Sequence, residues 1–520
     1  MNAVLSSTAI QFLGTLGAVW LSWRIWRFTI RPISHPNEPK ELPYWLPFIG
    51  HAADFFQSFN ATIAKGRKHF AASGEPFILT VAGQSIYIAT SPEDVNNVWN
   101  KSKSIAMQPI AEEMYTWVGI SEKGRKAMFD VHMGAKYYES AGRALNPTDM
   151  TKELHHQTLH NGPGLDELMI DKTIPVMAKK LEFAMGGKAT DSFTISLFDL
   201  CVDVFIASGT DTFFGPKLRQ LEPGLVDAFK DWEYSNWKFL FQIPGIFAKD
   251  MLASKHTLTS AFTRYYKMPR SERPGATHFV TALEDMLREA GLSETDMGNF
   301  TLLHYWAIFG NAYKLGFWLV AYLVHDASLL QHIRQEVLPA VKGDKVDETY
   351  LIEQCPKLES LLNETLRVIV QSSLGRGILE PTIIGGKLLQ PGHKIMVTPY
   401  SLYTLGLAAD DYQLPISELH LNPGVWGHDP DSFAPNRFIE NPKLTKSLSY
   451  RPWGGGTTVC PGRFFARRTV NALVALLVSR YDLEVVSESF PAVDDSRPSP
   501  GAILVARGQD VKMRCTTRKQ

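Results

Sequence analysis

The chain has 520 residues, of which 45% are hydrophobic and 20% are charged, as in ordinary globular proteins. Lysine plus arginine and aspartate plus glutamate both number 53, so the formal net charge is zero. This balance gives no bulk electrostatic support for nucleic-acid binding, and no basic stripe with interleaved aromatic residues supplies it locally. A neutral chain remains compatible with an apolar substrate and with a membrane.

The N-terminus carries an apolar stretch that is followed by basic residues. Residues 4–23 just reach the roughly 20 residues that a membrane-spanning helix needs. No lysine or arginine precedes the stretch, whereas Arg24, Arg27 and Arg31 follow it, which is the reverse of a cleaved signal peptide. We therefore expect residues 1–23 to be a transmembrane anchor in contact with lipid, with the remaining chain in the cytosol. A buried first helix is the alternative.

A basic, proline-rich segment, residues 24–51, follows the anchor. Five prolines between residues 32 and 47 should make it a stiff, extended hinge that holds a large domain at a fixed attitude to the bilayer. No long linker or repeat appears from residue 52 onward, so residues 52–520 are predicted to form one domain. Most of it should be helical, with short strands near residues 77–90, 376–398 and 483–515.

One predicted helix, Asn299–His325, is long and apolar enough to resemble a second membrane span. Ser293 and Asp296 supply capping chemistry just before it. The charge of Lys314 would be costly in lipid, so we expect this helix to cross the core of a soluble domain instead. We expect the Lys314 side chain to extend toward solvent between helices rather than to contact a substrate carboxylate.

The four cysteines do not form a disulfide framework or a C-x-x-C metal motif. Cys201 and Cys355 lie in apolar helical contexts, which predicts small buried side chains, and Cys515 lies in a polar C-terminal tail. Cys460 stands in the most specific segment of the chain, WGGGTTVCPGRFFA, residues 453–466. There a glycine-rich loop delivers one cysteine to the start of a helix, whose N-terminus favours a thiolate over a thiol. The glycines permit positive φ and a close approach of the backbone to a flat ligand.

This segment resembles the cysteine loop of the cytochromes P450, in which an aromatic residue lies seven positions before the cysteine, a glycine four before and a glycine two after. Trp453, Gly456 and Gly462 match those positions. The resemblance implies a mainly α fold with small β-sheets, an α+β class, in which haem b lies between the long central helix and the helix after the loop. Cys460 would be the axial thiolate ligand of the haem iron, a ligation that assists cleavage of the O–O bond.

Three further segments agree with the resemblance, in the expected order. Glu364 and Arg367 form an E-x-x-R pair on one face of a helix opened by Pro356, a pattern that is weak when it stands alone. Arg437, in the segment PNRF, resembles the arginine that joins this pair in a buried triad locking the cysteine loop. Arg376 resembles the arginine that pairs with a haem propionate. Among the branches of the family, the sequence is most similar to bile-acid hydroxylases, prostacyclin synthases and fungal biosynthetic enzymes.

Two positions depart from the family's pattern. Most oxygen-activating members carry an acid–alcohol pair in the long helix, and its hydroxyl helps to deliver protons during oxygen activation. Here the stretch is Gly310-Asn311-Ala312, in which Asn311 can orient water but Ala312 cannot donate a hydrogen bond. Thr458 stands where many members have an arginine or histidine that contacts a propionate. It can still form a hydrogen bond but brings no charge, which leaves more of the neutralisation to Arg376.

The resemblance implies an oxidoreductase, and two activities stay open. The first is a monooxygenase that oxidises a lipophilic small molecule, such as a terpenoid, a steroid-like compound or another secondary metabolite, with O2 and electrons from NADPH through a cytochrome reductase. The second is a haem-thiolate isomerase or dehydratase that acts on an already oxygenated substrate without reductase. A non-catalytic haem protein of the membrane is a third possibility.

The resemblance also implies where the partners bind. The enzyme would be a single-pass protein of the endoplasmic reticulum membrane with its catalytic domain in the cytosol. The reductase would dock on the cysteine face, where Arg463, Arg467 and Arg468 offer positive charge. The substrate wall is expected to come from four segments, residues 105–120, 307–312, 369–374 and 501–504.

Overall fold

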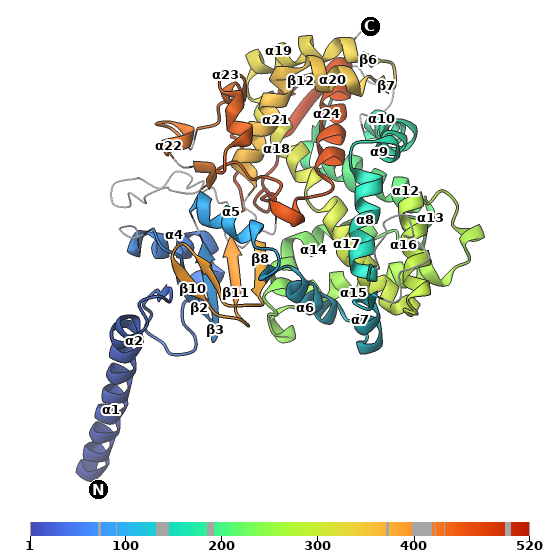
Figure 1. Ribbon diagram of the computed structural model, residues 1–520. Helices are drawn as coiled ribbons and strands as arrows, with labels where there is room; N and C mark the ends of the chain where they lie inside the picture. The colour runs from blue at the N-terminus through green and yellow to red at the C-terminus, as the bar shows by residue number, and fades with distance from the viewer. Residues whose placement is uncertain are drawn as a thin grey trace.

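Helices dominate the computed structural model, and small sheets lie at two separate places, at its lower left and at its upper end, which agrees with the expected α+β class (Figure 1). The structure describes residues 2–70, 74–89, 91–131, 145–184, 192–370, 374–397, 419–421, 423–430, 432–494 and 501–518.

The largest sheet has six strands in the order β1-β2-β3-β11-β8-β4. β2 and β3 form an antiparallel hairpin, β1 runs parallel to β2, and β11 runs parallel to β3. β8 runs antiparallel to β11 and places Arg376 opposite Ile395. The strands of this sheet are β1 Lys40–Glu41, β2 Phe77–Val81, β3 Gln84–Ala89, β4 Ile105–Ala106, β8 Leu374–Ile378 and β11 Lys394–Val397.

Three smaller sheets complete the β structure of the described chain. They comprise β5 Ser192–Ser196 with β12 Tyr481–Val485 and β13 Lys512–Thr517, β6 Val341–Lys342 with β7 Lys345–Val346, and β9 Thr382–Ile384 with β10 Lys387–Leu389. Strands therefore occur in each of the three ranges where the sequence predicts them.

The helices of the body pack around one large and three smaller apolar clusters in the part of the chain that the structure describes. They are α3 Ala52–Gln57, α4 Phe59–His69, α5 Pro92–Asn100, α6 Gln108–Val118, α7 Glu122–Met128, α8 Pro147–Leu159, α9 Pro163–Glu167, α10 Ile174–Ala184, α11 Leu197–Cys201, α12 Ser208–Phe214, α13 Lys217–Leu221, α14 Leu225–Leu240, α15 Lys249–Lys267, α16 His278–Glu289, α17 Glu294–Phe309, α18 Ala312–Val324, α19 Ala327–Val337, α20 Glu348–Gln354, α21 Pro356–Ile369, α22 Pro423–Trp426, α23 Arg437–Glu440 and α24 Arg463–Arg480.

The predicted long helix is present but is interrupted. α17 and α18 follow one another through the core, with Gly310 and Asn311 between them. A Cβ at Gly310 would lie 2.6 Å from the Trp306 carbonyl oxygen, and Asn311 has a non-helical φ of −124°. The segment from α17 to α18 has the length and hydropathy of a membrane span, but 78% of its most apolar window is buried inside the protein. It therefore crosses the protein core, as expected.

The three cysteines outside the glycine-rich loop are all buried. Cys201 and Cys355 occupy core positions, as their sequence contexts predict. Cys515, in the polar C-terminal segment, is also fully buried. β13 is the central strand of its sheet, between β12 and β5, so alternate residues of this polar segment face the core.

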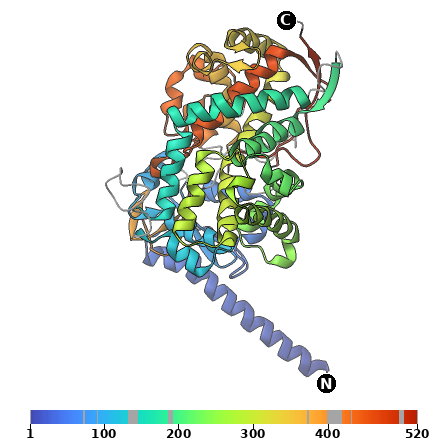
Figure 2. The same ribbon diagram turned by 90° about the vertical axis from the view of Figure 1, so that its right-hand side faces the viewer.

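α1, Asn2–Ile25, projects away from the body as a separate rod (Figures 1 and 2). Its apolar side chains are exposed, for example Ile10 at 69% and Leu13 at 66%, so the alternative of a buried first helix is wrong. The helix continues through a π-helical turn, η1 Trp26–Ile30, into α2 Arg31–Ser34. The first third of the predicted extended hinge is thus helical, because Pro32 lies in the first turn of α2, where proline is tolerated.

The base of this rod is fastened to the body. Trp20 stacks on Trp45 at 5.5 Å between ring centroids, and its indole nitrogen donates to the Trp45 carbonyl oxygen at 2.8 Å. Arg24 donates to the Tyr44 carbonyl oxygen at 2.5 Å. Arg27 pairs with the buried carboxylate of Glu41 at 2.5 Å. These contacts fix the direction in which α1 leaves the body.

Candidate functional site

The cysteine loop leads into α24 and presents the Cys460 side chain to an internal cavity. The Cys460 backbone N–H donates to the Trp453 carbonyl oxygen at 2.8 Å, which closes the loop on itself. Gly456 has a φ of +60°, and a Cβ there would lie 2.5 Å from the Trp99 carbonyl oxygen. Gly462, by contrast, has an ordinary φ of −78° at the start of α24. At Gly456 the positive φ and the close Trp99 carbonyl require a glycine. At Gly462 the backbone is ordinary, and the missing side chain leaves room beside the sulfur.

The environment of the Cys460 thiol contains two opposed effects. Burial raises its pKa, while the backbone N–H groups of Gly462 and Arg463 and the guanidinium charge of Arg463 lower it. The helix N-terminus thus favours a thiolate as predicted, although burial outweighs it in the free side chain. A metal ion bound to the sulfur would reverse that balance, since a coordinating thiol is deprotonated outright.

The cavity has a volume of about 270 Å³ and separates the cysteine loop from α17 and α18. Its walls are mostly apolar, with His155, Asn311, Arg451, Thr458 and Cys460 as their polar side chains. The apolar walls comprise Leu159, Ala307, Ile308, Ala312, Leu315, Leu366, Val370, Pro452, Trp453, Gly454, Pro461, Gly462, Phe465, Ala466, Gly501 and Ala502. Three of the four predicted substrate-wall segments contribute; residues 105–120 do not line this cavity, and residues 371–373 lie outside the described chain.

Arg376 gives a test of whether these residues suit a haem. Its side chain is nearly fully buried and contacts the Met107 sulfur at 3.3 Å, the Gly375 carbonyl oxygen at 2.9 Å and the Thr458 hydroxyl. Within the described chain no carboxylate pairs with it, and burial lowers its pKa to about 10. A buried cation beside a cavity with apolar walls and a thiol fits a flat apolar cofactor that carries carboxylates at its rim. The residues present therefore fit haem.

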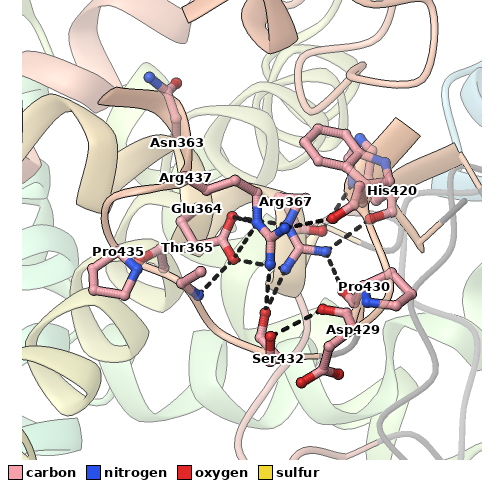
Figure 3. Close-up of polar contacts among 12 residues, drawn as sticks. Asn363, Glu364, Thr365, Arg367, His420, Asp429, Pro430, Ser432, Pro435 and Arg437 are labelled. Atoms are coloured by element: carbon pink, nitrogen blue, oxygen red, sulfur yellow. Dashed lines mark hydrogen bonds and ion pairs between the residues drawn. The ribbon is translucent and has the colours of Figure 1, made fainter. Parts of the chain in front are cut away.

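The structure brings Glu364, Arg367 and Arg437 together, as Figure 3 shows. Arg367 donates to both carboxylate oxygens of Glu364, at 2.8 and 2.7 Å, and the Arg437 Nε lies 3.2 Å from each. Glu364 and Arg367 are fully buried. Both arginines also donate to the Ser432 carbonyl oxygen, at 2.9 and 3.1 Å. The triad thus holds the segment that leads into the cysteine loop.

His420 connects this triad to the start of the cysteine loop, and the sequence did not reveal it. Its backbone carbonyl accepts from Arg367 at 2.8 Å, and its Nδ1 lies 3.0 Å from the Arg367 carbonyl oxygen (Figure 3). The backbone N–H of Arg451 donates to His420 Nε2 at 3.0 Å. Burial lowers the pKa of His420 to about 3, so the ring is neutral and the two hydrogen bonds fix its tautomer. No local sequence pattern marks this role, because its partners are distant in the chain.

On the opposite wall, Asn311 and Ala312 face the cavity, as the sequence interpretation requires. The Asn311 Oδ1 accepts from the Ala502 backbone N–H at 2.9 Å. That bond assigns the amide orientation and leaves Nδ2 as the donor. Gly310 does not line the cavity; it ends α17 and so allows Asn311 to turn out of the helix.

His155, on α8, is a further cavity residue that the sequence did not identify. Its Nδ1 lies 2.7 Å from the Thr151 carbonyl oxygen, and its ring stacks on His304 at 5.3 Å. Burial lowers the pKa of His155 to about 4 and that of His304 to about 3, so both rings are neutral at physiological pH.

The expectation that Lys314 extends toward solvent is wrong. Its ammonium group pairs with Glu233 of α14 at 2.6 Å, and both side chains are at most 3% exposed. Asn236 and the Tyr313 hydroxyl donate to the same carboxylate, at 3.1 and 3.2 Å. Lys314 therefore joins α14 to α18, and it is not among the residues that line the cavity.

The expected positive patch on the cysteine face is largely neutralised. Arg467 pairs with Glu359, and Arg468 pairs with Glu348 at 2.6 Å and with Asp166 at 2.7 Å. Arg463 differs, since its guanidinium contacts the Cys460 carbonyl oxygen at 2.9 Å and His160 Nε2 at 2.9 Å.

Comparison with known proteins is consistent with this site. A family model described as Cytochrome P450 matches residues 237–404 and 410–513. The monooxygenase poxD of Penicillium oxalicum is 22% identical, covering 87% of this chain and 88% of its own. The 5-beta-cholestane-3-alpha,7-alpha-diol 12-alpha-hydroxylase of Sus scrofa is 23% identical, covering 89% and 90%. The prostacyclin synthase of Rattus norvegicus is 22% identical, covering 93% and 94%.

Proposed function

The chain belongs to the cytochrome P450 family, and from this membership we propose that it is a haem-thiolate monooxygenase acting on a lipophilic small molecule. The substrate class is a terpenoid, a steroid-like compound or another secondary metabolite. The observation that carries the proposal is the cavity itself, with the Cys460 thiol on one wall, Asn311 on the other and mostly apolar side chains between them. Hydroxylases and monooxygenases among the mammalian and fungal relatives support oxygen insertion over rearrangement.

Each polar group of the cavity has a distinct task in this proposal. Bound haem supplies activation of dioxygen and transfer of one oxygen atom to the substrate. Cys460 Sγ would bind the haem iron, and the N–H groups of Gly462 and Arg463 would stabilise its negative charge. Arg376 would neutralise a carboxylate of the cofactor, and the triad of Glu364, Arg367 and Arg437 would hold the loop that positions Cys460.

In this proposal Asn311 carries the proton chemistry on the cavity wall opposite Cys460. Because its Oδ1 is held by the Ala502 N–H, its Nδ2 can donate to a water molecule or to a hydroxyl group of the substrate. The water or substrate hydroxyl bound to Asn311 then supplies the proton that a serine or threonine side chain at position 312 would deliver in other members of the family. Ala312 contributes space and excludes water next to the substrate.

Electrons would come from NADPH through a cytochrome reductase that docks over the loop of Cys460. Arg467 and Arg468 form ion pairs with glutamates of the protein itself. Of the three arginines Arg463, Arg467 and Arg468, docking would therefore depend on Arg463. Residues 1–23 would anchor the enzyme in the endoplasmic reticulum membrane, residues 24–51 would connect the anchor, and residues 52–520 would form the cytosolic catalytic domain. The exposed apolar side chains of α1 support a lipid environment for it.

The ligand assignment is tested with the difference spectrum of the reduced, CO-bound protein. The far-red-shifted Soret band of thiolate ligation is expected in wild type and in Cys515→Ala, and should vanish in Cys460→Ala. A band that survives in Cys460→Ala would show that another group ligates the iron.

The activity is tested by turnover of steroid-like and terpenoid substrates under isotopically labelled dioxygen. Labelled product is expected only when both NADPH and reductase are present. Product that forms without both would favour the isomerase or dehydratase instead.

A further inference from the structure

Arg451 is a second cation at the cavity, and its side chain has few partners. It lines the cavity directly, as Thr458 does. Its Nη1 donates to the Ser447 and Tyr450 carbonyl oxygens at 3.2 and 3.3 Å. No hydrogen bond from its Nε or Nη2 and no ion pair joins it to the described residues. Among the described residues, two of its nitrogens therefore have no acceptor.

The side chain is held in position by its backbone. The Arg451 N–H donates to His420 Nε2, which is itself tied to Arg367. Pro452 follows and restricts the backbone of Arg451 to extended conformations. The guanidinium carbon lies 6.0 Å from the ring centroid of Trp99, whose buried indole N–H also lacks a hydrogen-bond partner among the described residues. Two donors that lack an acceptor thus lie close together.

The neighbouring Thr458 cannot supply the missing donor. Its hydroxyl oxygen accepts from Arg376, and its hydrogen is directed at the Gly455 carbonyl oxygen at 3.1 Å. The hydroxyl therefore has no hydrogen left for a ligand. A cofactor with two carboxylates would find one cation in Arg376, beside Thr458, and needs a second donor for its other carboxylate.

We propose that Arg451 binds a carboxylate of the haem, so that the charge absent at position 458 is supplied from seven residues earlier in the chain. The proposal rests on haem as the cofactor. Arg376 and Arg451 would then share the two propionates, with Thr458 orienting Arg376 and not contacting the haem itself. A guanidinium suits this task, since it can donate two parallel hydrogen bonds to one carboxylate.

The test uses the full-length holoenzyme as wild type, Arg451→Gln, Arg451→Lys and a control, Arg264→Gln, which removes an arginine paired with Glu222 at the surface. The rate of haem loss to an excess of a haem-scavenging apoprotein and the midpoint potential of the haem are measured. We expect Arg451→Gln to lose haem about ten-fold faster and to have a lower potential, because a charge-assisted hydrogen bond and a cation are removed. Arg451→Lys should recover the potential, and Arg264→Gln should match wild type.

Reconstitution with haem dimethyl ester gives the decisive comparison, because the ester has no carboxylate charge. Wild type and Arg451→Gln should then lose the cofactor at similar rates. Equal haem loss with natural haem, or a difference that persists with the ester, would overturn the role of Arg451. Wild type that takes up no haem would overturn the proposed function itself, an outcome that is distinct from either.

Discussion

Replacing Lys314 by methionine tests whether its buried ion pair serves the fold or the substrate. The change leaves the Glu233 carboxylate buried, with Asn236 and Tyr313 as its remaining donors. Breaking a buried pair in this way costs about 3–5 kcal/mol. An unfolding entropy of about 2.1 cal/mol/K per residue gives about 1.1 kcal/mol/K for a chain of this length. The expected fall in melting temperature is therefore about 3–5 °C.

The assay is thermal unfolding of the holoenzyme followed by circular dichroism, with substrate KM measured in parallel. Lys230→Met on α14 is the matched control, since Lys230 pairs only with exposed carboxylates at 3.6 and 3.9 Å and should cost less than about 1 kcal/mol. Adding Glu233→Gln to Lys314→Met should restore most of the stability, because no unpaired charge is left in the core. If Lys314→Met kept the wild-type melting temperature and raised KM, the structural role would be refuted and a substrate contact would take its place.

Three other predictions address the cysteine loop, the distal wall and pH. Glu364→Gln should destabilise the protein by about 3–5 kcal/mol and lower the ratio of haem to protein, because the fully buried Arg367 and the partly buried Arg437 lose their counter-charge; normal haem content would contradict this. Asn311→Asp keeps the acceptor for the Ala502 N–H but removes the Nδ2 donor, so stability should hold while NADPH oxidation becomes uncoupled from product; equal coupling would exclude a role for Nδ2. Because the folded pKa of His304, about 3, lies below its unfolded value, the unfolded chain binds the extra proton and stability falls as pH drops below about 6.5. His304→Phe should lose about 2 kcal/mol less than wild type between pH 7 and pH 5 in denaturant titrations, and equal losses would count against the burial argument.

The parts of the site that the sequence predicted are those set by local spacing. The cysteine loop is one short segment, so the spacing of Trp453, Gly456 and Cys460 could be recognised directly. Glu364 and Arg367 are three residues apart on one helix, which places them on the same face. The burial of α17 and α18 also followed from composition, since Lys314 argued against lipid.

The parts that the sequence did not predict depend on tertiary partners. Glu233 is 81 positions before Lys314 and on another helix, and nothing near either residue signals the pair. The carboxylates that neutralise Arg468 come from two helices far apart in the chain. His420 and Arg451 acquire their positions from Arg367 through space. The interruption at Gly310 and Asn311 does have a local signal, because both residues have low helix propensity, but the surrounding apolar run predicted one continuous helix.

The attachment of α1 has a consequence for how membrane composition would affect the enzyme. From Asn2 to Ser34 the chain is helical over about 50 Å, at 1.5 Å per residue, and the contacts of Trp20, Arg24 and Arg27 join its base to the sheet side of the body. A helix that is mismatched to the local bilayer thickness responds by tilting. Here the catalytic domain would tilt with it, so bilayer thickness would set the height and angle at which a lipid-dissolved substrate meets the protein.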